Sequence, residues 1–416
     1  MLPAGQAYGH NVRFLDCLFT ATSAVCVTGL VVVDTATAWT RIGQTTIIIL
    51  IQGGGIGIIT FGALFALLLG HKFGFRQRAL IQEQLGDTSV VRITSLLRIV
   101  RVVAGTTFVI ELLGAILLYP MFAAKAGHSA GMFHAVFHAI SAFCNAGFST
   151  FSENLRGSQG HIGVNTVICL LIILGGLGFP VHAELLESRG KRRRLSLHTR
   201  VVLMTTIALI IGGAVFIFLF ETFAGSAYAG LPLKNRILAS IFQSVTARTC
   251  GFDTINIGAL TPATLVLLHV LMFIGGSPAG TAGGVKTTTF ATAIAAVRAV
   301  IKGREDVTIS DRRLERNTVR RALVLIIGAA GLLTVALVGL LLSGGGSPLQ
   351  LSFEAVSAFG TVGLSTGITP NLTAVQKIII ILLMFIGRVG PMSFALSLAR
   401  SRVEQIRFAE TDLLTG

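Results

Sequence analysis

Long apolar runs separated by short polar stretches make up most of the chain. The runs cover residues 44–69, 102–122, 164–179, 201–223, 265–274, 322–342 and 378–386, and glycines interrupt the first of them. A helix that crosses a bilayer needs roughly 20 mainly apolar residues, and several of the runs approach that length. The pattern therefore predicts an all-α integral membrane protein with several membrane-spanning helices.

The composition agrees with a lipid environment. Charged residues make up 12% of the chain and hydrophobic residues 53%, whereas about a quarter of the residues of a typical soluble domain are charged. So small a charged fraction leaves too little polar surface to cover a water-soluble body of 416 residues. We therefore expect a multi-pass protein of the cell membrane, surrounded by the lipid bilayer.

The positive charge is unevenly distributed along the chain. The formal net charge is +15, and most Lys and Arg residues fall in four clusters between the apolar runs, at 71–101, 189–200, 298–321 and 400–407. Basic loops mark the cytoplasmic side of membrane proteins, so these four loops are predicted to be cytoplasmic. The basic run at 191–194 could bind nucleic acid, but an anionic lipid surface accounts for it, and no nucleic-acid partner is expected.

Four stretches of the chain align without gaps around a glycine. The glycines are Gly29, Gly147, Gly251 and Gly363, and each has an apolar residue ten positions before it and another directly after it. In three of the four stretches, Ser-Ala stands six and five positions before the glycine. So close a match at similar spacing indicates a fourfold internal repeat.

Each repeat is predicted to contain an outer helix, a short pore helix, the glycine loop and an inner helix. A second glycine-rich block, which we assign to the inner helix, begins at residues 50, 173, 272 and 384. The expected repeats are 1–75, 76–190, 191–305 and 306–416. Residues 1–12 alone precede the first pore helix, and they are too few to span a bilayer. The first outer helix is therefore either absent or encoded upstream of this sequence, and we favour the second alternative.

A short helix followed by a glycine loop points to a pore. Irregular backbone at membrane depth is tolerated where it lines a watery cavity, and rings of backbone carbonyls form cation-selective filters. Glycine reaches positive φ and lets neighbouring backbones approach closely. Small residues for helix packing are the alternative, but four loops in register favour a filter. The expected ion-binding residues are Cys26, Val27, Thr28, Gly29, Cys144, Asn145, Ala146, Gly147, Arg248, Thr249, Cys250, Gly251, Gly360, Thr361, Val362 and Gly363.

A resemblance to a known family rests on three segments. They read Thr-Ala-Thr-Ser-Ala-Val-Cys-Val-Thr-Gly-Leu at 20–30, Ser-Val-Thr-Ala-Arg-Thr-Cys-Gly-Phe at 244–252 and Gly-Gly-Val-Lys at 283–286. They resemble the Trk/Ktr/HKT superfamily of potassium-translocating proteins, and the chain looks most like the membrane subunit of a bacterial Ktr system. The resemblance implies four pore-loop units around a central pore, a homodimer and a cytosolic ring of nucleotide-binding regulatory subunits. It also implies potassium selectivity, because glycine occupies all four filter positions; serine in the first loop goes with sodium permeation.

The third inner helix contains a segment that cannot be a comfortable helix. Its glycines and Pro278 disfavour the helix interior, so residues 275–285 are predicted to form a loop below the filter. By resemblance this loop is the gate. A phosphate-binding loop is the alternative, but Val285 replaces the glycine that this motif needs before its lysine. The expected gating residues are Gly275, Gly276, Ser277, Pro278, Ala279, Gly280, Thr281, Ala282, Gly283, Gly284, Lys286 and Arg388.

Charged residues within the apolar runs and loops are further candidates. Arg388 interrupts the fourth inner helix and is predicted to act as a cationic barrier in the pathway, with a structural ion pair or carbonyl clamp as the alternative. Lys286 either joins the gate or extends its ammonium group toward the membrane surface. Arg248 is expected to support the filter from behind through carbonyls or through a carboxylate of Glu111, Glu221 or Glu354.

Polar residues elsewhere give weaker signals. Asp34 and Asp253 follow filter glycines and would attract cations to the outer mouth, unless they are simply solvated loop residues. His134 and His138 share a helix face at metal-ligand spacing, but packing is the favoured interpretation because no third ligand accompanies them.

The sequence therefore predicts a pore for the uptake of potassium, the transported ion, that is either passive or stimulated by sodium and is regulated from the cytoplasm. The alternative is a proton- or sodium-coupled secondary transporter that works by alternating access. No catalytic set accompanies the motifs, so neither an enzyme nor an organic cofactor is expected.

Overall fold

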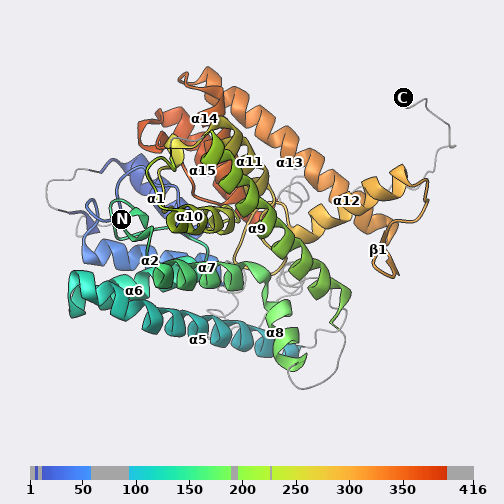
Figure 1. Cartoon of the computed structure of the whole chain (residues 1–416), viewed down its shortest axis with the longest axis horizontal. Helices are drawn as coiled ribbons and strands as arrows, with labels where there is room; N and C mark the ends of the chain where they lie inside the picture. The colour runs from blue at the N-terminus through green and yellow to red at the C-terminus, as the bar shows by residue number, and fades with distance from the viewer. Residues whose placement is uncertain (1–4, 8–11, 58–92, 189–194, 225–226, 391–416) are drawn as a thin grey trace.

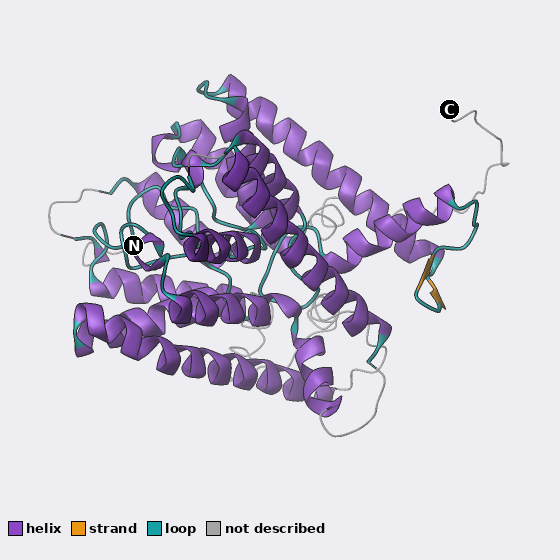
Figure 2. Cartoon of the chain, viewed as in Figure 1, coloured by secondary structure: helices purple, strands orange, loops and turns teal. Residues whose placement is uncertain are grey.

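The computed structural model describes residues 5–7, 12–57, 93–188, 195–224 and 227–390, and within 93–102 it describes the backbone alone. The basic cluster at 400–407 lies outside the described residues, and so do parts of the clusters at 71–101 and 189–200. The described part is mostly helical, with one short antiparallel pair of strands (Figure 2). The predicted helical fold is confirmed.

Figure 1 shows the helices with their labels, and their bounds follow in chain order. They are α1 (Phe14–Val25), α2 (Arg41–Gly55), α5 (Ile93–Ala126), α6 (His128–Phe143), α7 (Ile162–Leu177), α8 (Phe179–Ser188), α9 (Leu197–Phe223), α10 (Leu233–Thr246), α11 (Pro262–Phe273), α12 (Thr287–Ile301), α13 (Arg316–Leu342), α14 (Pro348–Gly360) and α15 (Ala374–Val389). The strands are β1 (Thr308–Ile309) and β2 (Arg312–Arg313), which form a small hairpin that projects from the body beside α12 (Figure 1).

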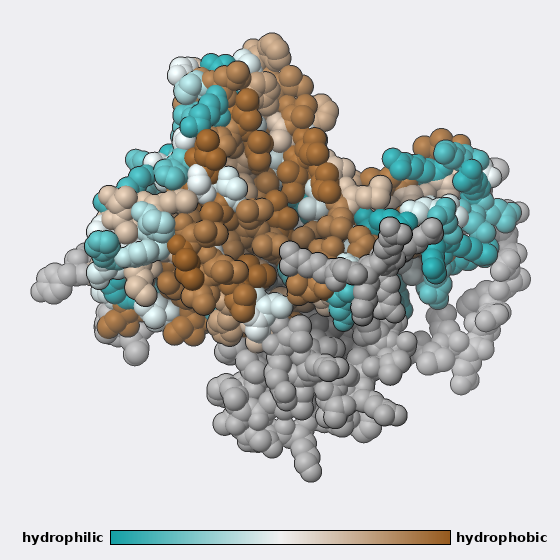
Figure 3. Space-filling view, turned by 60° about the horizontal axis from the view of Figure 1, so that its bottom comes forward, coloured by the Kyte–Doolittle hydropathy of each residue, from teal (hydrophilic) through white to brown (hydrophobic). Residues whose placement is uncertain are grey.

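Three of the described helices are long and apolar enough to cross a membrane. They are α9, α13 and the segment Val103–Ala126 of α5; a fourth candidate is the pair α7 and α8, which meet at an angle of 100°. Many large apolar side chains on the long helices are exposed, among them Phe108, Leu112, Ile116, Met204, Ile207, Ile211, Ile327 and Val335. Figure 3 shows hydrophobic surface over much of the body and hydrophilic residues around the projecting hairpin. Exposed apolar surface of this extent fits a protein surrounded by lipid.

Four of the described helices come directly before the glycine loops. They are α1, α6, α10 and α14, with 12 to 16 residues each, and at 1.5 Å per residue they reach at most about 24 Å, less than the hydrocarbon core. Each is followed by a loop and then by an apolar helix, in the order α1–α2, α6–α7, α10–α11 and α14–α15. The element order is the one predicted for the repeats, whose bounds remain predictions.

Local sequence explains where the apolar helices begin. Thr261 caps α11 by accepting a hydrogen bond from the backbone amide of Thr264. Thr373 and Gln376 form a reciprocal capping box at the start of α15. The Gln376 amide also donates to the carbonyl of Leu340 at 3.0 Å, which ties the start of α15 to the end of α13. Hydroxyl and amide side chains at these positions satisfy helix-end groups that have no partner within the helix.

Glycines allow three of the apolar helices to touch the ends of the short helices. A Cβ atom on Gly54 of α2 would overlap the carbonyl of Val25, the last residue of α1. Likewise a Cβ on Gly175 would overlap the carbonyl of Phe143, and one on Gly387 would overlap that of Phe359. Small residues let membrane helices approach closely. The glycine-rich blocks therefore set the distance between each apolar helix and the loop that precedes it.

We expect Gly54→Ala to destabilise the protein by about 1–3 kcal/mol, because the added methyl group overpacks the contact with Val25. The measurement is the thermal unfolding of the purified protein in detergent. Gly212→Ala in α9 is the matched control, since no atom lies within 4 Å of a Cβ built at Gly212. The control should be neutral or slightly stabilising. Equal effects of the two substitutions would contradict the close packing at Gly54.

Candidate functional site

The four glycine loops share one backbone conformation. The residue two positions before each glycine has positive φ although it is not glycine, and the glycine itself has positive φ as well. The φ angles are 56° at Val27, 59° at Asn145, 74° at Thr249 and 51° at Thr361, followed by 94° at Gly29, 65° at Gly147, 88° at Gly251 and 91° at Gly363. Left-handed backbone is uncommon outside glycine and persists only where the surroundings hold it. The same strained turn therefore occurs four times.

The loops contact one another in a closed ring. A Cβ atom on Gly29 would overlap the carbonyl oxygen of Ala146, which directly precedes the next glycine. The same relation joins Gly147 to Cys250, Gly251 to Val362, and Gly363 back to Thr28. Two constraints therefore require glycine at each of these four positions: the positive φ, and the carbonyl packed against the Cα atom.

Hydroxyl groups of the short helices hold the loops in shape. Ser23 accepts a hydrogen bond from the Gly29 amide at 3.1 Å, and Ser357 accepts one from the Gly363 amide at 3.1 Å. In the other two loops the hydroxyl donates instead: Ser141 to the Phe148 carbonyl at 2.8 Å and Thr246 to the Phe252 carbonyl at 2.7 Å. No role was predicted for these four residues from the sequence. The repeated serine six positions before the glycine was the signal that could have identified three of them.

Side chains of the loops are buried. Cys26, Cys144 and Cys250 are at most 2% exposed. Thr28, Thr249 and Thr361 are also buried, and their hydroxyl groups have no hydrogen-bond partner within the described residues. Buried hydroxyls normally find a partner. These three threonines are therefore candidates for contact with water or an ion at the ring.

Residues 274–286 form a non-helical loop between α11 and α12. Its two ends are joined: the Gly275 amide donates to the Val285 carbonyl at 2.9 Å, and the Val285 amide donates to that of Phe273 at 3.2 Å. The body of the loop is bound to α7, since the amides of Ser277 and Thr281 donate to carbonyls of its last turn at 2.9 and 3.1 Å. All of the predicted gating residues except Arg388 lie in this loop.

The 274–286 loop also touches the glycine loops. The Thr281 hydroxyl donates to the Phe143 carbonyl at 3.1 Å and lies 3.2 Å from the side-chain amide of Asn145. A Cβ on Gly283 would overlap the Thr361 hydroxyl. The second and fourth glycine loops are therefore in direct contact with this segment.

Two cationic side chains bind carbonyls at the 274–286 loop. The Arg388 guanidinium donates to the carbonyl of Thr281 in the loop and to that of Gly54 in α2. Lys286 folds back onto its own loop, where its ammonium group donates to the Ala282 carbonyl at 2.7 Å. Arg388 thereby clamps the loop to α2, which matches the carbonyl-clamp alternative; the barrier role stays a prediction.

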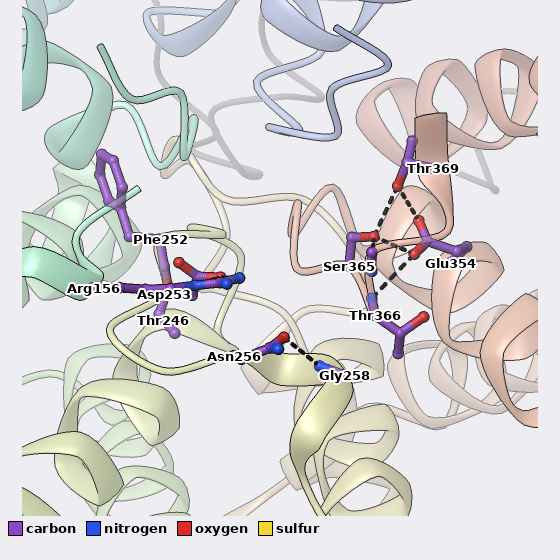
Figure 4. Close-up of polar contacts among 11 residues, drawn as sticks. Arg156, Thr246, Phe252, Asp253, Asn256, Gly258, Glu354, Ser365, Thr366 and Thr369 are labelled. Atoms are coloured by element: carbon purple, nitrogen blue, oxygen red, sulfur yellow. Dashed lines mark hydrogen bonds and ion pairs between the residues drawn. The ribbon is translucent and has the colours of Figure 1, made fainter. Parts of the chain in front are cut away.

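Arg248 bridges the third glycine loop to two other segments. It is 6% exposed, and its guanidinium donates to the carbonyls of Thr206 in α9 at 3.3 Å and of Gly275 at 3.2 Å. The expected support through carbonyls is therefore correct and the carboxylate alternative is wrong. The three glutamates bind other groups: Glu111 accepts from Gln52, Glu221 from Thr261, and Glu354 from Ser365, Thr366 and Thr369 (Figure 4).

The two aspartates that follow filter glycines are both engaged. Asp34 accepts from the Ala36 amide at 2.9 Å and from the Thr37 hydroxyl at 3.1 Å. Asp253 forms an ion pair with Arg156 at 2.6 Å (Figure 4).

The paired histidines bind protein groups in the structure. His138 contacts the His134 carbonyl at 2.7 Å and the Ser149 hydroxyl at 3.0 Å, and its ring stacks on Phe151. His134 contacts the Thr150 hydroxyl at 2.6 Å. Within the described part of the chain, no three His, Cys, Asp or Glu side chains gather as a metal site.

Comparison with known proteins identifies close relatives over the full length. The chain is 38% identical to Ktr system potassium uptake protein B of Bacillus subtilis, over all of this chain and 92% of the relative. It is 37% identical to the protein of the same name from Vibrio alginolyticus, covering 90% of that relative. Potassium/sodium uptake protein NtpJ of Enterococcus hirae is 36% identical and is covered to 92% of its length.

A structural comparison and a family profile agree with these relatives. The crystal structure of the potassium transporter TrkH from Vibrio parahaemolyticus matches with a TM-score of 0.74 at 18% sequence identity, over 94% of this chain and 79% of that one, so the two share a fold. The profile of the TrkH family, described as cation transport protein, matches residues 4–406. The chain therefore belongs to the TrkH cation transport family and is a transporter rather than an enzyme.

Proposed function

We propose that this protein takes up potassium ions across the cell membrane through a filter made by the four glycine loops. The observation that carries the proposal is the closed ring in which each filter glycine packs against the carbonyl of the next loop. A ring of carbonyls can replace the hydration shell of a monovalent cation. The carbonyls of residues 26–29, 144–147, 248–251 and 360–363 would bind the ion.

Potassium is the proposed substrate for two reasons. Glycine stands at all four filter positions, and no side chain narrows or charges the ring there. The relatives from Bacillus subtilis and Vibrio alginolyticus are named for potassium uptake, and the relative from Enterococcus hirae is named for potassium and sodium uptake. Sodium is therefore proposed as a stimulating ion and not as the main substrate.

The 274–286 loop is proposed to be the gate. It contacts the second and fourth filter loops through Thr281 and Gly283, and Arg388 holds it against α2. Among the described residues, the Arg388 guanidinium has carbonyls as its hydrogen-bond partners. It therefore keeps its full positive charge, which repels cations that leave the filter. Displacement of the loop and of Arg388 together would open the path, with Lys286 fixing the far end of the loop.

The proposed assembly is a homodimer that binds a cytosolic ring of nucleotide-binding regulatory subunits. The word "system" in the names of the Bacillus and Vibrio relatives supports additional subunits. The basic clusters, among them 298–321, would face the cytoplasm and such partners. This segment contains the projecting hairpin (Figure 1).

A coupled transporter with alternating access is the second candidate. The break between α7 and α8 and the non-helical segment 274–286 are the observations that favour it, since broken helices mark the binding sites of secondary transporters. The ring of four similar loops favours the pore.

Ion uptake into proteoliposomes tests the proposal. The purified protein should give saturable potassium flux that sodium cannot replace, with and without an imposed proton gradient. Flux that requires a proton or sodium gradient would favour the coupled transporter. A folded protein without potassium flux in the presence of its cytosolic subunits would refute the filter assignment.

We expect Gly29→Ser to lower the preference for potassium over sodium by about tenfold, or ~1.4 kcal/mol, because the side chain meets the Ala146 carbonyl and disturbs the ring. The measurement is competition between the two ions for uptake. Gly212→Ser is the matched control, since its surroundings are open. An unchanged preference in the Gly29 variant would contradict a filter at this position.

Deletion of residues 277–280 should raise potassium flux several-fold, because it removes contacts that hold the loop beneath the filter. Arg388→Gln should raise flux less, since it releases the clamp and leaves the loop in place. Initial rates of uptake at matched amounts of reconstituted protein provide the comparison. If the deletion variant folds and its flux equals that of the unmodified protein, the loop is not the gate.

A further inference from the structure

Asp253 lies close to the third filter glycine. It is two residues beyond Gly251, and an extended chain covers at most about 3.6 Å per residue, so the two Cα atoms are within about 7 Å. The intervening Phe252 is fully buried, and its carbonyl accepts a hydrogen bond from Thr246 at 2.7 Å. The Asp253 carboxylate is therefore held at a fixed place on the side of the filter from which the chain enters α11.

Among the described residues, one cation binds this carboxylate. Nη2 and Nε of Arg156 both donate to Oδ2 of Asp253, at 2.6 and 3.2 Å. The other oxygen, Oδ1, is buried and has no hydrogen-bond partner within the described residues. The Asp253 side chain is 10% exposed and that of Arg156 38% exposed, so the arginine is the more accessible partner of the pair.

The ion pair joins two filter-loop segments. Arg156 belongs to the connection between the second glycine loop and α7, and the Leu155 amide beside it donates to the Asp253 carbonyl at 3.1 Å. The other two ion pairs among the described residues join Arg313 to Asp306 and Lys377 to Asp16. Of these three ion pairs, the one between Arg156 and Asp253 includes a residue two positions after a filter glycine.

We propose that Arg156 is a built-in counter-charge that tunes how strongly Asp253 attracts potassium to the entrance of the filter. The inference rests on the proposed function. A lone carboxylate would concentrate cations at the entrance, whereas a guanidinium in contact with it cancels most of that field beyond a few ångströms. A unit charge about 10 Å away changes the local cation concentration about twofold in water, and more where protein excludes water. Arg156 and Asp253 therefore set the apparent affinity of uptake together, with opposite signs.

The sign of each substitution separates this role from a structural one. Arg156→Gln should lower KM for potassium roughly two- to fivefold, and Asp253→Asn should raise it by a similar factor, because each leaves one uncompensated charge. The double variant should return close to the KM of the unmodified protein. All shifts should shrink when an impermeant salt raises the ionic strength. Initial uptake rates in proteoliposomes at low ionic strength supply the data.

Two matched controls accompany these variants. Arg156→Lys keeps the charge and should leave KM nearly unchanged. Glu153→Gln removes one negative charge from the same connection. Because Glu153 is exposed, water and salt screen its charge, and its effect on KM should be smaller than that of Asp253→Asn.

Chemical modification tests the charge in a protein that has already folded. Arg156→Cys can be reconstituted and then treated with a cationic or an anionic methanethiosulfonate reagent, while the unmodified protein controls for the native cysteines, four of which are buried. The cationic reagent should raise KM toward its original value, and the anionic reagent should lower it further.

The possible outcomes discriminate between the hypotheses. Opposite shifts in KM for the two single variants support the inference. If KM shifts in the same direction in both single variants, or if the cationic and anionic reagents change KM in the same way, the inference is overturned. The ion pair would then have a purely structural role. Absence of potassium flux in the folded, unmodified protein together with its cytosolic subunits would instead overturn the proposed function.

Discussion

The contact between each filter glycine and the carbonyl of the next loop is the constraint on which the rest of the structure depends. Each contact needs a residue without Cβ, with positive φ, at a fixed place on the ring. A backbone with these strained turns cannot hold itself in place. The short helices, their serine and threonine hydroxyls and the glycine-packed apolar helices supply the support, and all of them lie within hydrogen-bond or van der Waals reach of the loops.

The cationic side chains near the ring of glycine loops form hydrogen bonds mainly with backbone carbonyls. Arg248, Lys286 and Arg388 all donate to carbonyl oxygens, and within the described residues none of the three forms an ion pair with a carboxylate. A cation solvated in this way keeps its charge, while a salt bridge would cancel much of it. On the other side of the filter the arrangement differs, because Asp253 is paired with Arg156. The proposed pathway therefore runs from a nearly neutral entrance to a positively charged gate.

A surrounding lipid bilayer explains why so much of the protein surface is apolar. The exposed leucine, isoleucine and phenylalanine side chains of α5, α9 and α13 would be a liability in water. Around a bilayer-spanning body they are the expected covering, and they free the interior for glycines, hydroxyls and a few charges.

The sequence by itself determined the class of the protein and the position of its loops. Hydrophobic runs, the fourfold glycine pattern and the glycine-proline segment at 275–285 are local signals, so the helices, the glycine turns and the break after α11 could be located from them. Tertiary structure alone decided which groups the charged side chains contact. Arg388 reaches Gly54, which is more than 300 residues away in the chain, and Arg248 binds carbonyls although three glutamates were available in the sequence. Asp253 is paired with Arg156 and not free to attract cations alone. Such pairings depend on how the helices pack and on where each carbonyl points. The spacing of residues along the chain determines neither of these.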